Sequence, residues 1–376
     1  MIKVLYLIDT LYQGGAETLV KDYCLLLDKS KFEVSVLCLK RLGSKYEEIL
    51  QNNGIKVCFL YDYWHYNPKT FCGRVINKIV HITRMDVFLA WCIVKKLRPD
   101  VIHAHLFVLG LLKHISPKKE TKIIYTVHSE PQSYWHCKTK LSKNEFYSCQ
   151  WMIKNRGLRL IALHDSMQHE LNTLFHVDNT IVVNNGINFE KFSNCVPKNK
   201  MREILHIPQD SFVVGHVGRF AAVKNHEFIL SVFKKLLLTQ KNAVLVLVGN
   251  GMLFEKIKNK VAEMNLTEKI YFLDNRLDVP DIMNAMDVFL FPSVYEGLGI
   301  VLIEAQKAGL PCVISDCIPK AAIVSNLVTS LSLNASDQQW VDALRRQRPQ
   351  EIKYLNIDAW NMRNVIKKLE KVYCEG

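Results

Sequence analysis

Residues 293–316 read SVYEGLGIVLIEAQKAGLPCVISD. The stretch follows a short apolar run, VFLFP (288–292), and ends in another, PCVISD (311–316). Both runs have the length and the β-branched or aromatic residues of buried strands. The apolar segment between them has the spacing of a helix and begins after a glycine-rich loop. This order predicts two parallel strands joined by a right-handed helical crossover.

The same alternation continues along most of the chain and occurs in two series. The first series of expected strands comprises residues 2–8, 32–39, 55–60, 100–106, 122–128, 159–164 and 180–186, and the second comprises 212–218, 243–249, 269–273, 288–292 and 311–316. Helical spacing of apolar residues predicts helices that include 16–27, 226–237 and 358–373. We therefore expect an α/β protein with two Rossmann-like, doubly wound domains that face each other across a cleft, closed by a C-terminal helix.

The length of 376 residues also favours two domains, because one core seldom serves so long a chain. A polar stretch, NCVPKNK (194–200), follows the first series of strands. We expect an N-terminal domain at residues 1–190 and a C-terminal domain at residues 191–357. Residues 358–376 form the terminal helix, for which packing on the N-terminal domain is one option.

Composition narrows the class of protein. The net charge of +13 suits anionic partners, but no nucleic-acid binding is expected because the basic residues do not interleave with aromatics as in a known module. The 11 cysteines form no CxxC motif, which predicts reduced cysteines and no zinc site. The N-terminus lacks a signal-peptide pattern, and no run reaches the roughly 18 apolar residues of a membrane span. We expect a soluble protein, or one held at a membrane only by its surface.

Residues that follow the first-series strands are candidates for a site, because ligands of open α/β sheets bind beyond the carboxyl ends of the strands. Gly14 and Gly15 open a helix, where glycines let an anion approach backbone N–H groups; a plain turn is the alternative. His128 ends a strand and can hydrogen-bond a sugar hydroxyl or a phosphate. Lone histidines, including the two of HAH (103–105), are more often structural, and the sequence places no third ligand for a metal.

In the second series, Arg219 and Lys224 lie five residues apart in the turn that follows the expected strand 212–218. An arginine fork and a lysine point charge at this spacing can clamp a diphosphate, although solvated loop charges are the alternative.

The loop of the opening stretch completes this candidate site. Gly297, Leu298 and Gly299 lie where free N–H groups of a helix N-terminus favour phosphate. Glu296 in the loop can accept hydrogen bonds from sugar hydroxyls. Glu304, inside the helix, can accept both hydroxyls of a ribose. A nucleotide-sugar contains a ribose, a diphosphate and a sugar in that order.

Together these motifs resemble the retaining glycosyltransferase family 4, whose members have the GT-B fold. The resemblance covers nearly the whole chain and rests on YQGGAE (12–17), RPDVIHAH (98–105), YTVHSE (125–130), VVNNGIN (182–188), GRF..VKN (218–225), the segment from 273 to 293, and EGLGIVLIEAQKAGLPCV (296–313) with its two glutamates. SDCIPK (315–320) resembles members that build bacterial capsules and exopolysaccharides. Asn188 stands where many members have Asp, and Ala321 and Ala322 stand where related members often have Glu.

The resemblance implies roles for individual residues. Arg219 and Lys224 would bind the donor diphosphate, Glu304 the ribose and Glu296 the donor sugar. His128 would lie near the transferred sugar and Gly15 near the phosphates. We expect a UDP- or GDP-linked donor, no cofactor and no metal.

The resemblance also implies a place and an acceptor. We expect a polyprenyl-diphosphate-linked saccharide acceptor and a cytoplasmic enzyme at the inner face of the cell membrane. Residues 72–99 give separate support, because basic side chains flank Phe88 and Trp91 there, as in an interfacial amphipathic helix. The basic side chains are Arg74, Lys78, Arg84, Lys95, Lys96 and Arg98. Burial of this apolar stripe in the core is the alternative.

Other classes of function stay open on sequence alone. A glycosidase also uses two carboxylates but has no need of the Arg219 and Lys224 clamp. A sugar-nucleotide epimerase can share the architecture, and a binding scaffold with a decayed site would lack the two signature glutamates that this chain has. Of these classes, a glycosyltransferase of capsule, exopolysaccharide or O-antigen synthesis agrees with the most residues.

Overall fold

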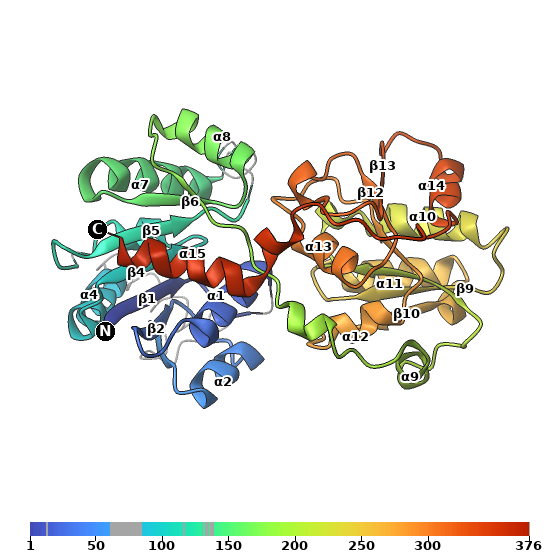
Figure 1. Ribbon diagram of the computed structural model, residues 1–376, viewed down its shortest axis with the longest axis horizontal. Helices are drawn as coiled ribbons and strands as arrows, with labels where there is room; N and C mark the ends of the chain where they lie inside the picture. Colours follow the sequence, from blue (N-terminus) through green and yellow to red (C-terminus); the bar gives the residue numbers. More distant parts are fainter. Residues whose placement is uncertain are drawn as a thin grey trace. The chain divides into compact units, whose positions relative to one another are not determined.

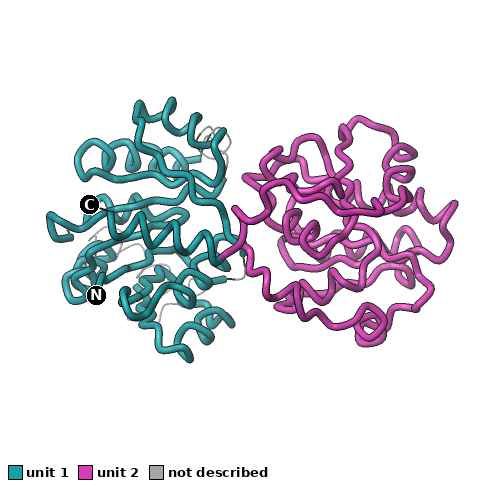
Figure 2. The backbone as a smooth tube through the Cα atoms, in the orientation of Figure 1, with its two compact units in different colours: residues 1–186, 363–376 teal, residues 187–362 magenta. Residues whose placement is uncertain are grey.

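The computed structural model describes residues 1–12, 14–60, 85–115, 117–129, 131, 135 and 139–375. The chain divides into two compact units (Figure 2). Unit 1 comprises Met1–Gly186 and Arg363–Gly376, and unit 2 comprises Ile187–Met362. The division after residue 186 lies four residues before the expected boundary, and the C-terminal residues return to unit 1.

Unit 1 contains a seven-stranded parallel sheet in the order β3-β2-β1-β4-β5-β6-β7, with helices on both faces (Figure 1). The strands are β1 (Ile2–Ile8), β2 (Phe32–Cys38), β3 (Lys56–Phe59), β4 (Val101–His105), β5 (Lys122–Thr126), β6 (Arg159–Ala162) and β7 (Ile181–Val182). The helices are α1 (Gly15–Leu26), α2 (Lys45–Asn52), α4 (Met85–Leu97), α5 (Leu109–Leu112), α7 (Lys140–Arg156), α8 (Asp165–Phe175) and α15 (Met362–Cys374). The central strands are buried on both faces, which explains their near-continuous apolar sequences.

The terminal helix α15 packs within unit 1. It begins at Met362, four residues later than expected, because Ile357–Trp360 form a separate 3-10 helix and Asn361, which is extended, pairs with Ile187. The N–H of Ile187 donates to the carbonyl of Trp360 at 2.7 Å, and the N–H of Met362 donates to the carbonyl of Ile187 at 2.9 Å. Within the helix, Val365, Leu369 and Tyr373 are buried, and their spacing of four places them on one face.

Unit 2 contains a six-stranded parallel sheet in the order β10-β9-β8-β11-β12-β13. The strands are β8 (Phe212–Val217), β9 (Ala243–Val248), β10 (Ile270–Leu273), β11 (Val288–Phe291), β12 (Cys312–Ser315) and β13 (Val328–Leu331). The α-helices are α9 (Lys198–Ile204), α10 (His226–Leu236), α11 (Phe254–Glu263), α12 (Val279–Asn284), α13 (Ile300–Lys307) and α14 (Asp337–Leu344). Both units have the strand order of a doubly wound sheet, which confirms the predicted fold class.

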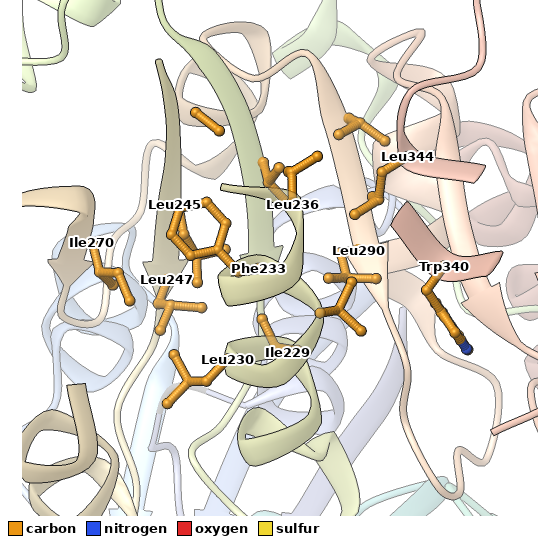
Figure 3. Packing of buried hydrophobic residues seen from close by; sticks show 14 of the residues in the cluster. Ile229, Leu230, Phe233, Leu236, Leu245, Leu247, Ile270, Leu290, Trp340 and Leu344 are labelled. Carbon is orange, nitrogen blue, oxygen red and sulfur yellow. The ribbon is translucent and has the colours of Figure 1, made fainter. Parts of the chain in front are cut away.

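The core of unit 2 holds the helix that follows the Arg219 and Lys224 loop. Figure 3 shows side chains of α10, among them Phe233 and Leu236, packed against β9 and β11. Trp340 of α14 closes the side of this cluster and is completely buried. Because α10 is anchored along its length, the loop at its N-terminus has a well-defined position.

In the ranges that the structure describes, no helix is long and apolar enough to cross a membrane.

Candidate functional site

The strand order of unit 2 defines where its site lies. β8 and β11 are neighbours, yet the chain leaves β8 toward β9 and leaves β11 toward β12. Such a switch point opens a crevice at the carboxyl ends of the two strands, where ligands of doubly wound sheets bind. Arg219 and Lys224 follow β8, and the loop from Glu296 to Gly299 follows β11. The topology therefore brings the two sequence motifs to the same edge of the sheet.

Close packing of backbone shapes the loop after β8. Gly249 has φ of +132°, and a Cβ atom there would lie 2.3 Å from the carbonyl oxygen of Gly218. The N–H of Phe220 donates to the carbonyl of Asn250 at 3.0 Å, and the Phe220 ring is completely buried. Arg219 lies between these anchored residues, and its side chain is exposed. The loop thus holds the backbone of Arg219 while its guanidinium remains accessible to a ligand.

Lys224 and Glu296, which are 72 positions apart, form an ion pair. The Nζ atom of Lys224 lies 2.5 Å from Oε1 of Glu296, and the two side chains are only 14% and 13% exposed. The same Nζ lies 4.7 Å from the centre of the Phe291 ring. The N–H of Val294 donates to the carbonyl of Val223 at 2.8 Å, so the backbones of the two loops are also bonded. The predicted diphosphate-binding and sugar-binding residues therefore belong to one preformed pair.

The N-terminus of α13 is open in the way the sequence predicts for an anion site. Gly299 occupies the N-cap with φ of +78°, and no side chain caps the helix. A Cβ atom at Gly299 would lie 3.2 Å from the Phe291 ring, so both conformation and space favour glycine. Leu298 is buried and anchors the loop. Gly297 is half-buried in the same loop, and Glu304 is half-buried in the second turn of α13.

Two histidines near Lys224 were not predicted from the sequence to belong to the site. His216 and His226 are buried, with ring centres 5.0 Å apart, and the Phe220 ring stacks on His226 at 4.1 Å. Desolvation, together with the nearby Lys224 charge, lowers the pKa of His226 to about 4. His226 is therefore neutral at pH 7 and adds no second charge beneath Lys224. Their only sequence signal was a position beside the GRF..VKN motif.

In unit 1 the switch point lies between β1 and β4. Gly14 is the N-cap of α1, without a side-chain cap, and Gly15 is the first residue of the helix. A Cβ atom at Gly15 would meet nothing within 4 Å, so packing within the protein does not require glycine there. This open space agrees with a position at which a ligand could approach the backbone.

His128 lies two residues beyond the end of β5, half-buried, and contacts the second histidine of the HAH motif. Its Nε2 atom lies 2.9 Å from Nδ1 of His105. Desolvation lowers the pKa of His128 to about 4, so the ring is neutral at pH 7. Glu130, which follows in the motif, lies outside the described residues.

The expected membrane-facing segment is only partly described, since Arg74, Lys78 and Arg84 lie outside the described residues. In α4, Phe88 is exposed and Lys95 lies over the Trp91 ring at 4.7 Å. These two aromatic residues, with Val87 and His114, line a cavity of about 350 Å³. Lys95, Lys96 and Arg98 are exposed at the C-terminal end of the helix.

Metal ligands were not expected, and the described part of the chain contains no group of three or more His, Cys, Asp or Glu side chains that could hold a metal ion.

Both halves of the chain match models of glycosyltransferase families. Residues 13–191 match the model described as Glycosyltransferase Family 4, and residues 197–353 match the model described as Glycosyl transferases group 1. These two matches meet near the division between units 1 and 2.

Named relatives point in the same direction. The chain is 29% identical over 353 residues to a putative glycosyltransferase, EpsF, of Bacillus subtilis, with 92% of this chain and 87% of the relative covered. It is 29% identical over 296 residues to the UDP-Gal:alpha-D-GlcNAc-diphosphoundecaprenol alpha-1,3-galactosyltransferase of Escherichia coli, with 74% and 76% covered. Among solved structures, Anabaena Alr3699/HepE in complex with UDP and glucose has a TM-score of 0.74 and 17% identity over 99% of each chain, a likeness of fold.

Proposed function

We propose that this chain, which is a GT-B glycosyltransferase, moves a sugar from a nucleotide-sugar to a lipid-linked saccharide during the synthesis of a capsule, exopolysaccharide or O-antigen. The reaction would retain the anomeric configuration and need no metal ion. Two names support the class of substrate: the Escherichia coli relative uses UDP-galactose and a diphosphoundecaprenol-linked acceptor, and the Anabaena structure contains UDP and glucose. The donor of this chain would be UDP- or GDP-linked.

The ion pair of Lys224 and Glu296 is the observation that carries the proposal. It lies at the switch point of unit 2, where a doubly wound sheet binds its ligand, and it is largely shielded from water. An ammonium group has three donors, so Lys224 can keep Glu296 and also bind a phosphate oxygen. Glu296 has a second carboxylate oxygen with which it can accept a sugar hydroxyl. The ion pair can therefore bind both the diphosphate and the sugar of the donor.

The chemistry follows from where charge develops. As the bond between the anomeric carbon and the donor phosphate breaks, negative charge grows on the diphosphate and positive charge on the sugar ring. Lys224, the exposed guanidinium of Arg219 and the uncapped N–H groups of α13 would stabilise the leaving diphosphate. The acceptor oxygen then bonds to the anomeric carbon on the same face, and its proton passes to a leaving phosphate oxygen. No protein nucleophile is needed in this route.

Three further residues would lie against parts of the donor. Glu304, in the second turn of α13, would accept hydrogen bonds from the ribose hydroxyls. His128, neutral at pH 7, would hydrogen-bond the transferred sugar without adding charge. Gly15 would leave space for the phosphates at the N-terminus of α1.

Peripheral binding to an anionic membrane is part of the same proposal. Lys95, Lys96 and Arg98 at the end of α4, beside the exposed ring of Phe88, have the chemistry of an interfacial helix. Sedimentation with anionic vesicles should increase with anionic lipid and decrease with salt. Equal binding to neutral vesicles would contradict an electrostatic role for these residues.

A panel of nucleotide-sugars tests the donor site first. The true donor should raise the melting temperature, because a ligand that binds only the folded protein stabilises it. In Glu304→Ala this shift should become much smaller, whereas Glu351→Ala, which changes an exposed carboxylate outside the site, should keep it. A panel without any stabilising nucleotide-sugar, or a shift unchanged in Glu304→Ala, would contradict the assignment.

Transfer of labelled sugar to a polyprenyl-diphosphate-linked saccharide tests the reaction. The product should keep the anomeric configuration of the donor, and EDTA should leave the rate unchanged. An inverted product would refute retention, and loss of activity in EDTA that a divalent ion restores would refute metal independence. An isomerised donor without transfer would instead identify an epimerase.

A further inference from the structure

Unit 1 contains a chain of hydrogen-bonded side chains that the proposed reaction does not use directly. The hydroxyl of Tyr373, on α15, lies 2.9 Å from the hydroxyl of Tyr6 and 2.6 Å from Nδ1 of His103. Nε2 of His103 lies 2.7 Å from Oγ1 of Thr126. Both nitrogens of His103 are therefore bonded, and residues from β1, β4, β5 and the terminal helix hold its ring in place.

His105 packs directly on this fixed ring. The ring centres of His103 and His105 are 4.2 Å apart, and the Tyr6 ring lies 5.8 Å from His105 on the same side of the sheet. His105 is completely buried. Its Nδ1 atom faces Nε2 of His128, while its Nε2 atom is buried and has no hydrogen-bond partner among the described residues. The orientation of His105 is thus set by packing, and one of its nitrogens points at the proposed substrate-binding histidine.

Counting protons decides which of the two rings donates. Desolvation lowers the pKa of His105 well below its ordinary value and that of His128 to about 4, so each ring carries a single N–H at pH 7. If Nε2 of His128 donated, the proton of His105 would lie on its own Nε2, as a buried N–H without an acceptor. If Nδ1 of His105 donates instead, its Nε2 atom carries no proton, and only the lone pair of that buried nitrogen is left without a partner. Among buried backbone groups, an N–H without an acceptor is rarer than a carbonyl with an unused lone pair, and we apply the same preference to the imidazole of His105.

We propose that His105 is a positioning residue, which donates from Nδ1 to Nε2 of His128 and so keeps the proton of His128 on Nδ1. His128 then presents a neutral N–H donor on the side of the ring that faces away from His105. Nδ1 of His128 has no hydrogen bond with the part of the chain that the structure describes, so it is available to an oxygen of the transferred sugar. The hydrogen bond from His128 to the sugar rests on the proposed function, but the tautomer of His128 does not.

The terminal helix takes part in this arrangement. Tyr373 orients His103, the His103 ring supports His105, and His105 holds His128. The last turn of α15 is therefore linked to His128 through the side chains of Tyr373, His103 and His105. His103 and Tyr373 are 270 positions apart.

Nitrogen NMR of the ¹⁵N-histidine-labelled full chain, without ligand at pH 7, tests the tautomer. His105 and His128 should both show a protonated Nδ1 and an unprotonated Nε2, with signals assigned from His105→Asn and His128→Ala. A protonated Nε2 in His128 would overturn the proposal. This measurement needs no transferase activity, so it stands even if no donor or acceptor is found.

Matched variants test the positioning role. The amide of His105→Asn can place an N–H near the position of Nδ1, whereas His105→Leu has similar bulk but no donor. We expect His105→Asn to keep the His128 tautomer and a kcat within about threefold of wild type, and His105→Leu to lose about tenfold or more in kcat with little change in KM, as for one lost hydrogen bond. Thr121→Val, which removes a buried hydroxyl that bonds the carbonyl of Pro99 and lies outside this chain of side chains, serves as the control and should keep both tautomer and kcat.

The outcomes separate the two proposals. A folded His105→Leu protein with wild-type kcat and KM would show that His105 does not act through His128. If His105→Leu does not fold, His105→Asn with a changed tautomer or a large loss of kcat would do the same. If no nucleotide-sugar is transferred by wild type, the proposed function fails, and the NMR result alone decides the tautomer.

Discussion

The two units place different chemistry at equivalent points of similar sheets. At the switch point of unit 2, a largely buried ion pair of Lys224 and Glu296 joins two loops. At the carboxyl ends of β4 and β5 in unit 1, two neutral imidazoles, His105 and His128, are joined by one hydrogen bond. A doubly wound sheet therefore determines where a site lies, and the side chains at the strand ends determine which part of a substrate it can bind.

This difference agrees with the parts of a nucleotide-sugar. A diphosphate leaving group gains charge during transfer and needs fixed cations in a site of low dielectric. A sugar hydroxyl or an acceptor needs orientation by neutral hydrogen-bonding groups, because an extra cation would compete for the diphosphate. We expect changes at the unit 2 pair to have larger effects than changes at the unit 1 glycine loop.

The largest effect should follow from breaking the ion pair. Lys224→Met leaves the Glu296 carboxylate shielded and without its cation, which should lower the free energy of unfolding by about 3 kcal/mol. It should also lower kcat/KM by about 10²–10³-fold, since the leaving diphosphate loses a fixed charge. Urea unfolding and steady-state kinetics measure the two effects.

The double variant Lys224→Met, Glu296→Gln separates stability from catalysis. Removing both charges should restore most of the lost stability, because no unpaired charge remains, while activity stays low. Recovery of activity in the double variant would show that the pair acts only on folding.

Arg219 tests whether an exposed cation in the same site matters. Arg219→Ala should lower kcat/KM by about 10–100-fold with little change in stability, because the guanidinium is exposed in the free protein. Arg345→Ala, which changes an exposed arginine near the end of α14, is the matched control and should be neutral. Equal activity of the two variants would place Arg219 among ordinary surface cations.

Acid should destabilise the protein through its buried histidines. Burial lowers the pKa of His103 to about 3 and that of His128 to about 4, from an ordinary value of 6.5. Between pH 6.5 and about 4, the unfolded chain binds protons at these residues that the folded protein does not bind. The free energy of unfolding should therefore fall as the pH is lowered through this window, as thermal unfolding at several pH values can measure.

Glu145 acts in the opposite direction and provides a control. Its carboxylate, on α7, accepts hydrogen bonds from the N–H groups of Leu109 and Gly110. Desolvation raises the pKa of Glu145 from 4.5 to about 7. Between those values the folded protein keeps a proton that the unfolded chain releases, so this residue favours folding at the acid end. In Glu145→Gln that contribution is lost, and stability should fall more steeply on acidification. An unchanged slope would contradict the raised pKa.

The smallest effect is expected at the glycine loop of unit 1. Gly15→Ala should leave the melting temperature unchanged, since a methyl group there meets nothing within 4 Å, but should lower kcat/KM about three- to tenfold if phosphates approach this backbone. Gly251→Ala is the contrast in unit 2, because its Cβ atom would lie 2.5 Å from the carbonyl oxygen of Phe220 and should destabilise the fold. Wild-type activity in Gly15→Ala would remove Gly15 from the donor site.

Local sequence was sufficient for most of the strands and for the fold class. β1 covers the predicted residues 2–8, and most other strands differ from prediction by one or two residues at their ends. Fully buried parallel strands are recognisable because burial on both faces demands continuous apolar runs. β13 was missed because its VTSL sequence is only half-buried. α14 was missed because a helix of eight residues has too few apolar positions for a clear period.

The amino-acid sequence by itself determined the two α/β units, the glycine loops after the strands and the residue types at the strand ends, because each depends on local burial and backbone conformation. Only the tertiary structure decided which of these residues meet. The pairs Lys224–Glu296, His105–His128 and His103–Tyr373 are separated by 72, 23 and 270 positions. Their contacts depend on strand order and on the return of α15 to unit 1, and no local pattern of hydrophobicity encodes the distance between such side chains.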